Sequence, residues 1–95
     1  MATFTVSEII DGDTFSVAGG WRWNGRSGER VRPTGYDTPE LPNPEGYAAK
    51  QKLEQLILKE RVELSNPATI DRGRLVCDVY FNGHPLKEYF PEHKT

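Results

Sequence analysis

The apolar residues of this 95-residue sequence alternate as in β-strands along most of the chain, and only one stretch follows the period of a helix. In that stretch charged residues cover much of the surface, and an apolar stripe at helical spacing is made by Ala49, Leu53, Leu56 and Ile57. A single helix among short strands limits the chain to a small β-rich fold.

Three strands are predicted before this helix, from runs of β-branched and aromatic residues at positions 3–10, 14–18 and 29–32. Asp11-Gly12-Asp13 separates the first two strands, and a turn is expected at Asn24–Gly28 before the third. Trp21 and Trp23 stand two positions apart, so both indoles would share one face. There they would cover the barrel or, alternatively, stack on nucleic-acid bases.

A loop containing three prolines, Asp37–Gly46, is expected before the helix because proline interrupts both helix and central strand. Two strands are predicted after the helix. The first is Arg61–Ser65, with a turn at Asn66-Pro67, and the second has an inward face made by Leu75, Cys77, Val79 and Phe81. Five strands with one main helix between the third and the fourth match a mainly β fold, the OB-fold barrel.

The composition, with 36% hydrophobic and 27% charged residues, suits one small soluble domain covering residues 1–95. No apolar run is long enough to span a bilayer, and the N-terminal sequence lacks a signal-peptide pattern, which favours a cytoplasmic location. The lone Cys77 cannot form an internal disulfide, and its apolar neighbours indicate a buried side chain. His84 and His93 lack neighbours at metal-ligand spacing and are interpreted as surface residues.

The formal net charge of −2 argues against nucleic-acid binding through an overall positive field. Two local basic clusters, Arg26–Arg32 and Arg72–Arg74, can still supply phosphate contacts. Part of the negative charge stands beside turn-like segments, where it could hold a cation, at Asp11, Asp13, Asp37 and Glu40.

A site for a hard cation needs carboxylates presented from turns, where main-chain carbonyls can also point at the ion. Asp13 lies where a turn enters a strand, and Asp37 opens a loop in which Pro39 holds Thr38 extended. Each of these motifs alone is commonly just a turn, so only their combination points to a site.

That combination reads D-G-D-T-F, then V-R-P-T-G-Y-D-T-P-E, then the amphipathic helix, then D-R-G-R-L before a strand. It resembles the staphylococcal nuclease, or thermonuclease-like, family, in which strand, turn, loop and helix occur in this order. The resemblance extends from about Val6 to Tyr89, nearly the whole chain.

The resemblance implies a Ca²⁺-dependent nuclease that hydrolyses phosphodiester bonds of DNA or RNA, preferably single-stranded. Asp13 and Asp37 would be carboxylate ligands of one Ca²⁺, and Thr38 a main-chain carbonyl ligand. Glu40 would activate the attacking water, either by removing its proton or by ordering it. Arg32 and Arg74 would clamp the phosphate. The bond broken would be the one to the 5′ oxygen, leaving 3′-phosphate ends.

The sequence also departs from this family. The segment Asp71–Arg74 is one residue shorter than the usual D-x-Y-G-R and lacks its tyrosine, so Arg72 is an alternative to Arg74 as phosphate ligand. Pro33 removes a main-chain N–H from the third strand. After Gly83 only Pro85–Phe90 could form a short helix, which leaves the barrel with less helical cover than the family commonly has.

These departures leave two other hypotheses about the function open. The chain could be a nuclease-like module that binds single-stranded nucleic acid or a protein partner without cleaving anything. It could also be the core of a larger protein that is not active alone. An isolated arginine such as Arg74 could simply pair with Asp71, and Glu40 could simply face solvent.

Overall fold

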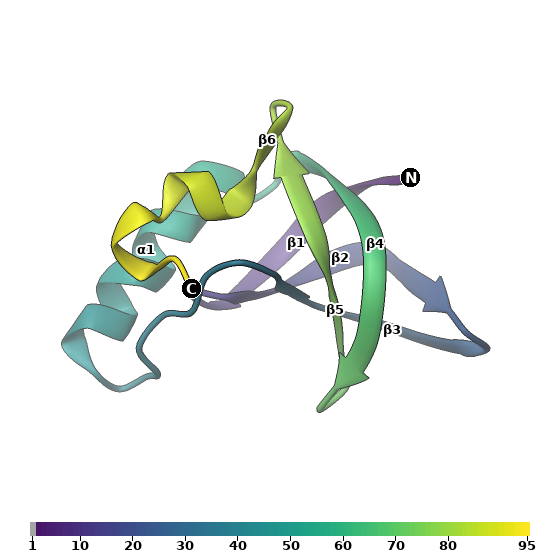
Figure 1. Cartoon of the computed structure of the whole chain (residues 1–95), viewed down its shortest axis with the longest axis horizontal. Helices are drawn as coiled ribbons and strands as arrows, with labels where there is room; N and C mark the ends of the chain where they lie inside the picture. The colour runs from purple at the N-terminus through teal and green to yellow at the C-terminus, as the bar shows by residue number, and fades with distance from the viewer. Residues whose placement is uncertain (1) are drawn as a thin grey trace.

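Five long strands and one α-helix follow one another as predicted in the computed structural model, which describes residues 2–95 (Figure 1). The elements are β1 (Ala2–Asp11), β2 (Thr14–Trp23), β3 (Arg26–Pro33), α1 (Pro44–Ile57), β4 (Arg61–Asp71) and β5 (Arg74–Phe81). The strands form one sheet in the order β3-β2-β1-β4-β5, and parallel pairing of β3 with β5 closes it into a barrel. The prediction of an OB-like barrel with a helix between the third and fourth strands is confirmed.

The core of the barrel comes from the alternating apolar positions of the strands and from the apolar face of α1. Leu75, Cys77, Val79 and Phe81 of β5 are all buried, as predicted. On α1 the buried residues are Gly46, Ala49, Leu53 and Ile57, whereas Leu56 is only partly buried. Burial raises the pKa of the Cys77 thiol to about 12, so this side chain is a protonated core residue.

The helix begins two residues earlier than the expected end of the proline-rich loop at Gly46. The side chain of Asn43 accepts a hydrogen bond from the N–H of Glu45 at 2.9 Å, and Pro44 occupies the first turn. Proline is favoured in this position because the first N–H groups of a helix have no partner within it. The loop is therefore shorter than predicted. No helix among residues 2–95 has both the length and the apolar character needed to cross a membrane.

Strands β2 and β3 are longer than the sequence predicted. Only Asn24 and Gly25 turn the chain, both with positive φ, and β3 starts at Arg26 instead of Glu29. This is the two-residue hairpin that suits the twist of paired strands. Trp21 and Trp23 both lie in the lengthened end of β2, where Trp21 is 3% exposed and Trp23 packs partly against the core.

Asn66-Pro67 was expected to end a strand as a turn, and this expectation is wrong. Strand β4 continues to Asp71 through a bulge, with a register shift against β5 between Ser65 and Thr69. Asn66 adopts a φ of 50°, which asparagine tolerates better than most residues. The bulge absorbs both Asn66 and Pro67 without ending the pairing.

The carboxylate of Asp78 on β5 holds this bulge. It accepts hydrogen bonds from Asn66 Nδ2 at 3.0 Å and from Thr34 Oγ1 at 2.5 Å, which joins β4 and β5 to the end of β3. These two hydrogen bonds hold the pKa of Asp78 below its ordinary value of 3.8.

Because the folded state lowers this pKa, Asp78 contributes stability above its ordinary pKa and loses it as the pH falls. We therefore expect Asp78→Asn to lower the melting temperature near neutral pH. Between about pH 5 and about pH 3, the melting temperature of this variant should fall less than that of the original chain. Thermal melts followed by circular dichroism measure both effects. Glu54→Gln, which removes a carboxylate from the surface of α1, is the control. An unchanged acid dependence in Asp78→Asn would contradict this assignment.

The C-terminal segment, residues 84–95, packs beside α1 and the loop after β3 (Figure 1). It contains β6 (His84–Pro85) and two short 3₁₀ helices, η1 (Leu86–Tyr89) and η2 (Pro91–His93), where the sequence predicted a short helix at Pro85–Phe90. Phe90 is fully buried and stacks on Tyr36, with ring centroids 4.6 Å apart. The segment therefore supports the chain just before Asp37.

Candidate functional site

Nine polar or charged residues and Pro39 lie together at one end of the barrel, and eight of the nine are charged. They line a cleft of about 210 Å³ between the β1-β2 turn, the end of β3 with its following loop, and the β4-β5 hairpin. The lining residues are Asp11, Asp13, Arg32, Asp37, Thr38, Pro39, Glu40, Asp71, Arg72 and Arg74. All six residues that the sequence assigned to a site lie here: Asp13, Arg32, Asp37, Thr38, Glu40 and Arg74.

Asp13 occupies the centre of this arrangement. It is 6% exposed, and its Oδ2 lies 2.7 Å from Nη1 of Arg32. The same oxygen accepts a hydrogen bond of 3.3 Å from the N–H of Thr38. Nη2 of Arg32 lies 3.1 Å from Oδ1 of Asp37, so one guanidinium bridges both carboxylates.

Arg32 is a permanent cation in this setting. Although partial burial alone lowers its pKa, the hydrogen bonds and the negative charges of Asp13 and Asp37 outweigh that effect and raise the pKa above its ordinary value. Arg32 reaches the cleft from β3, where it lies between the buried residues Val31 and Pro33. Outward-facing side chains alternate with these inward ones, which directs Arg32 toward the two carboxylates.

The β1-β2 turn is fixed by contacts that the sequence did not indicate. Tyr36 donates a hydrogen bond from its hydroxyl to the carbonyl oxygen of Gly12 at 3.0 Å. A Cβ atom on Gly12 would lie 2.6 Å from Cβ of Ala49 and 2.7 Å from Oγ1 of Thr38. Only glycine therefore lets the turn approach both α1 and the loop after β3.

We expect Gly12→Ala to destabilise the protein by about 1–3 kcal/mol, because the added methyl group must push Ala49 or Thr38 away. Urea unfolding measures this difference. If the contact with Ala49 is responsible, the double variant Gly12→Ala/Ala49→Gly will lose less than the sum of the single variants. Additive losses would show that the contact with Ala49 is unimportant.

The two arginines of the β4-β5 hairpin differ in how they are held. Arg74 donates to Thr14 Oγ1 at 3.0 Å and to Asp71 Oδ2 at 2.9 Å, and its side chain is 18% exposed. Arg72 is exposed, has a φ of 54° and makes no hydrogen bond or ion pair with residues 2–95. Arg74 thus reaches the cleft, and the pairing with Asp71 that the sequence left open as an alternative also forms.

The carboxylates of the cleft are not arranged as a closed metal cage. Within residues 2–95, no three Asp, Glu, His or Cys side chains converge closely enough to hold a metal ion by themselves. Ca²⁺ also accepts main-chain carbonyls and water molecules, so it needs fewer side chains than that. Among the residues that the structure describes, Asp37 uses only Oδ1 in its ion pair, and Oδ1 of Asp13 meets only the hydroxyl of Thr14, at 3.4 Å. One oxygen of each carboxylate thus remains free of N–H donors.

A second feature fits a hydrated cation. Oγ1 of Thr38 is a buried polar atom without any hydrogen-bond partner among residues 2–95. A buried hydroxyl normally has a partner, because leaving it without one costs free energy. Water carried into the cleft by an ion is one source of such a partner. The donor set, made of carboxylates, a hydroxyl and a carbonyl, is of the hard oxygen type that Ca²⁺ prefers.

Sequence reasoning assigned three residues that build the cleft to no site, although it counted Asp11 among the acids that could hold a cation and Asp71 as a possible partner of Arg74. Asp71 and Asp11 line it, and the motifs D-R-G-R and D-G-D already contain them. Thr14 holds Arg74 across a separation of 60 residues. No local sequence pattern predicts that contact, because it forms only when β2 and β5 come together in the barrel.

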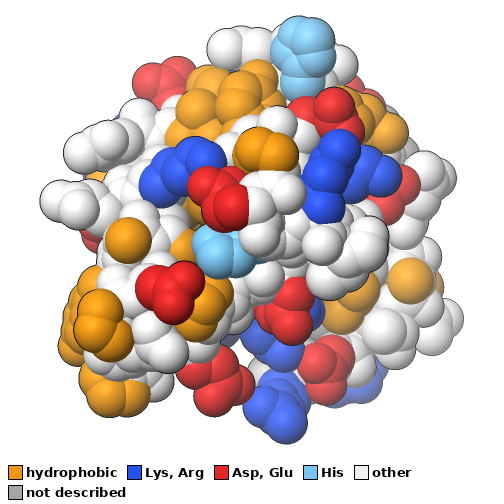
Figure 2. All heavy atoms as spheres, turned by 60° about the vertical axis from the view of Figure 1, so that its left-hand side comes forward, with side chains coloured by type: hydrophobic (Ala, Val, Ile, Leu, Met, Phe, Trp, Pro, Cys, Tyr) orange, Lys and Arg blue, Asp and Glu red, His pale blue; other side chains and the backbone are white. Residues whose placement is uncertain are grey.

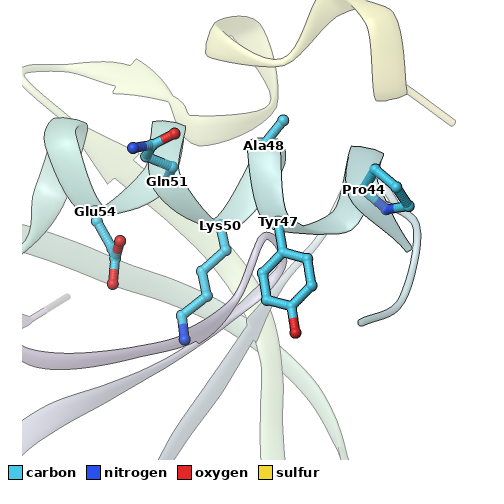
Figure 3. Close-up of a pocket in the computed structure, with 6 residues that line it drawn as sticks. All are labelled: Pro44, Tyr47, Ala48, Lys50, Gln51 and Glu54. Carbon is cyan, nitrogen blue, oxygen red and sulfur yellow. The ribbon is translucent and has the colours of Figure 1, made fainter. Parts of the chain in front are cut away.

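The other hollows described among residues 2–95 gather fewer charged side chains. A larger one, of about 500 Å³, runs along α1 and is lined by Pro44, Tyr47, Ala48, Lys50, Gln51 and Glu54 (Figure 3). It holds one cation and one carboxylate only. On the side that carries α1 and the C-terminal segment, acidic and basic side chains are interspersed and form no field of one sign (Figure 2). The charged cleft remains the best candidate site.

Comparison with known proteins adds no relative. The chain matches no protein-family model and no curated protein sequence. The resemblance to the staphylococcal nuclease family therefore rests on the motifs of the sequence alone.

Proposed function

We propose that this chain is a Ca²⁺-dependent nuclease that hydrolyses phosphodiester bonds of DNA or RNA by attack of water. The observation that carries the proposal is the charge of the cleft. Its five carboxylates face three guanidinium groups, which leaves a formal charge of −2. One divalent cation balances that charge, and two of the carboxylates each keep an oxygen free to bind it.

Asp13, Asp37 and the main-chain carbonyl of Thr38 would hold the ion. When bound, Ca²⁺ would polarise a non-bridging oxygen of the phosphodiester. Asp13 is already fixed by Arg32 and by the N–H of Thr38, so binding would need little rearrangement of this ligand. Asp37, whose side chain is 62% exposed, lies on the open side of the cleft, where a substrate can enter.

The arginines would meet the negative charge that develops on the phosphate oxygens as water attacks. Arg32 and Arg74 carry planar guanidinium groups that donate paired hydrogen bonds, which suits a phosphate better than a lysine does. Arg74 is held in place by Thr14 and Asp71 and Arg32 by Asp13 and Asp37, so both are oriented before substrate arrives. The exposed Arg72 can contact a neighbouring phosphate.

Glu40 would activate the water, by accepting its proton or by orienting it. Its side chain is exposed and lines the cleft. Its position is fixed through the main chain, since its carbonyl accepts a hydrogen bond from Asn43 and packs against Gly46 of α1. Cleavage of the bond to the 5′ oxygen would leave a 3′-phosphate end.

A labelled single-stranded DNA oligonucleotide, incubated with Ca²⁺ or with a chelator and analysed on a gel, tests the proposal. We expect cleavage in Ca²⁺ only, and loss of about two to three orders of magnitude in rate for Glu40→Gln. Glu54→Gln on the outer face of α1 is the matched control, and it should cleave normally (Figure 3). Equal residual activity in both variants would point to a contaminating nuclease.

A second function, a module that binds single strands without cleaving them, is favoured by one observation. Arg32 already pairs with both Asp13 and Asp37 and offsets part of their negative charge, which lowers the need for a metal. Oligonucleotide binding that persists in a chelator, together with no cleavage in Ca²⁺ by a folded protein, would select this alternative.

Arg32→Ala separates the phosphate role of this arginine from its contact with the metal ligands. We expect turnover to fall by about two to three orders of magnitude, while the Kd for Ca²⁺ changes far less. Single-turnover kinetics and calorimetric titration of Ca²⁺ measure the two quantities. An equal loss of both would mean that Arg32 acts mainly by positioning Asp13 and Asp37.

A further inference from the structure

The end of the β2-β3 hairpin forms an arm, defined here as residues Gly19–Arg30, that extends away from α1 (Figure 1). The arm contains three arginines and one glutamate, so its formal charge is +2 in a chain whose net charge is −2. A hollow of about 400 Å³ at its tip is lined by Arg22, Trp23, Asn24, Gly25, Arg26 and Ser27. The arm is therefore a local basic surface on an acidic protein.

The arginines of the arm are free to bind a ligand. Arg22, Arg26 and Arg30 are exposed, and none of them makes a hydrogen bond or an ion pair with another side chain among residues 2–95. By contrast, Arg32 and Arg74 are both held by aspartates. Unpaired guanidinium groups gathered on one hairpin give a surface that attracts anions.

The two tryptophans have different roles in the arm. Trp21 is 3% exposed, and its Nε1 donates to the carbonyl oxygen of Arg30 at 2.8 Å. Its ring lies over Gly28, where a Cβ would come within 2.8 Å of it. These contacts join the two strands of the arm, and Trp21 also belongs to the hydrophobic core of the barrel. Trp23 is only partly buried and lies opposite Arg26 in the strand register, so part of its ring is available to a ligand.

The arm is continuous with the charged cleft. Arg30 and Arg32 lie two positions apart on β3, on either side of the buried Val31, so both face outward. In the closed barrel Arg30 is also the register partner of Arg74 on β5. A line of guanidinium groups therefore runs along β3 from the tip of the arm to the cleft. Arg26 and Arg32 are about 20 Å apart along an extended strand.

We propose that the arm binds the part of a single-stranded nucleic acid that lies beyond the cleft, with phosphates on Arg22, Arg26 and Arg30 and a base stacked on Trp23. The choice of a single-stranded nucleic acid as the ligand rests on the proposed nuclease function. Arginines free of ion pairs and a partly exposed indole form the combination that holds a single strand without reading its sequence. An acidic protein segment would use the arginines but has no need of the ring.

Binding is tested on the full chain in a chelator, so that cleavage does not intervene. Fluorescence anisotropy is measured with a labelled DNA strand of about 16 nucleotides and with a tetranucleotide, which is too short to reach from the cleft to the tip of the arm. The arm variant is Arg22→Gln/Arg26→Gln. Its control, Lys50→Gln/Lys59→Asn, removes the same charge elsewhere, and asparagine tolerates the φ of 67° at position 59.

We expect the arm variant to bind the long strand about tenfold more weakly. The slope of log K against the logarithm of the salt concentration should be less steep by about 1.4, because two phosphate contacts are lost. The control should bind within about twofold of the original chain. Trp23→Leu, which keeps an apolar side chain against the core, should lose about fivefold or more. Tetranucleotide binding should be the same in all variants. Circular dichroism melts verify that each variant is folded.

Equal weakening in the arm variant and in the control would overturn the proposal, as would failure of the original chain to bind the long strand. Arm-dependent binding of polyglutamate as strong as that of DNA would also overturn it, in favour of an acidic protein partner. Cleavage of the tetranucleotide in Ca²⁺ is measured separately. If the chain cleaves the tetranucleotide but the arm variant binds the long strand as well as the original chain does, the nuclease function stands and the inference about the arm is wrong. If binding depends on the arm but no cleavage occurs, the inference about the arm is supported and the proposed nuclease function is wrong.

Discussion

The ion pair between Asp13 and Arg32 joins the parts of the chain that build the cleft. Asp13 ends the β1-β2 turn, Arg32 belongs to β3, and Thr38 of the following loop donates its N–H to the same carboxylate oxygen. A carboxylate whose side chain is 9% exposed is costly unless charges and hydrogen bonds compensate for lost hydration. Removal of either partner would leave the other charge poorly compensated, so the turn, the strand and the loop are fixed together.

This pair depends in turn on packing behind it. The turn can reach the loop only because Gly12 has no side chain, and Tyr36 holds the carbonyl of Gly12. Tyr36 is itself fixed by its stacking on Phe90 from the C-terminal segment. Burial is the main reason why the pKa of Tyr36 is raised, so its hydroxyl stays protonated and keeps donating its hydrogen bond. The C-terminal segment thus packs behind the site and supports it through Tyr36.

The alternation of apolar residues predicted the strands, and the helical stripe predicted α1, because both periods follow directly from backbone geometry. The boundaries were less accurate. Pro44 continues into a helix because its missing N–H is harmless there, and the pairing of β4 with β5 continues through Asn66-Pro67 because a bulge accommodates both residues. In each case a residue type that usually ends an element is tolerated at one special position.

The sequence by itself determined the order of the strands and the helix along the chain and the buried faces of α1 and β5, because both periods are local. The six residues proposed for the site came from the resemblance of the motifs to a known family. Only the tertiary structure decided that these six residues share one cleft with Asp11, Asp71 and Arg72. It also decided that Arg74 is held by Thr14 and that Arg30 lies beside Arg74. The physical reason is barrel closure: the pairing of β3 with β5 joins segments more than 40 residues apart, and no local pattern encodes such a contact.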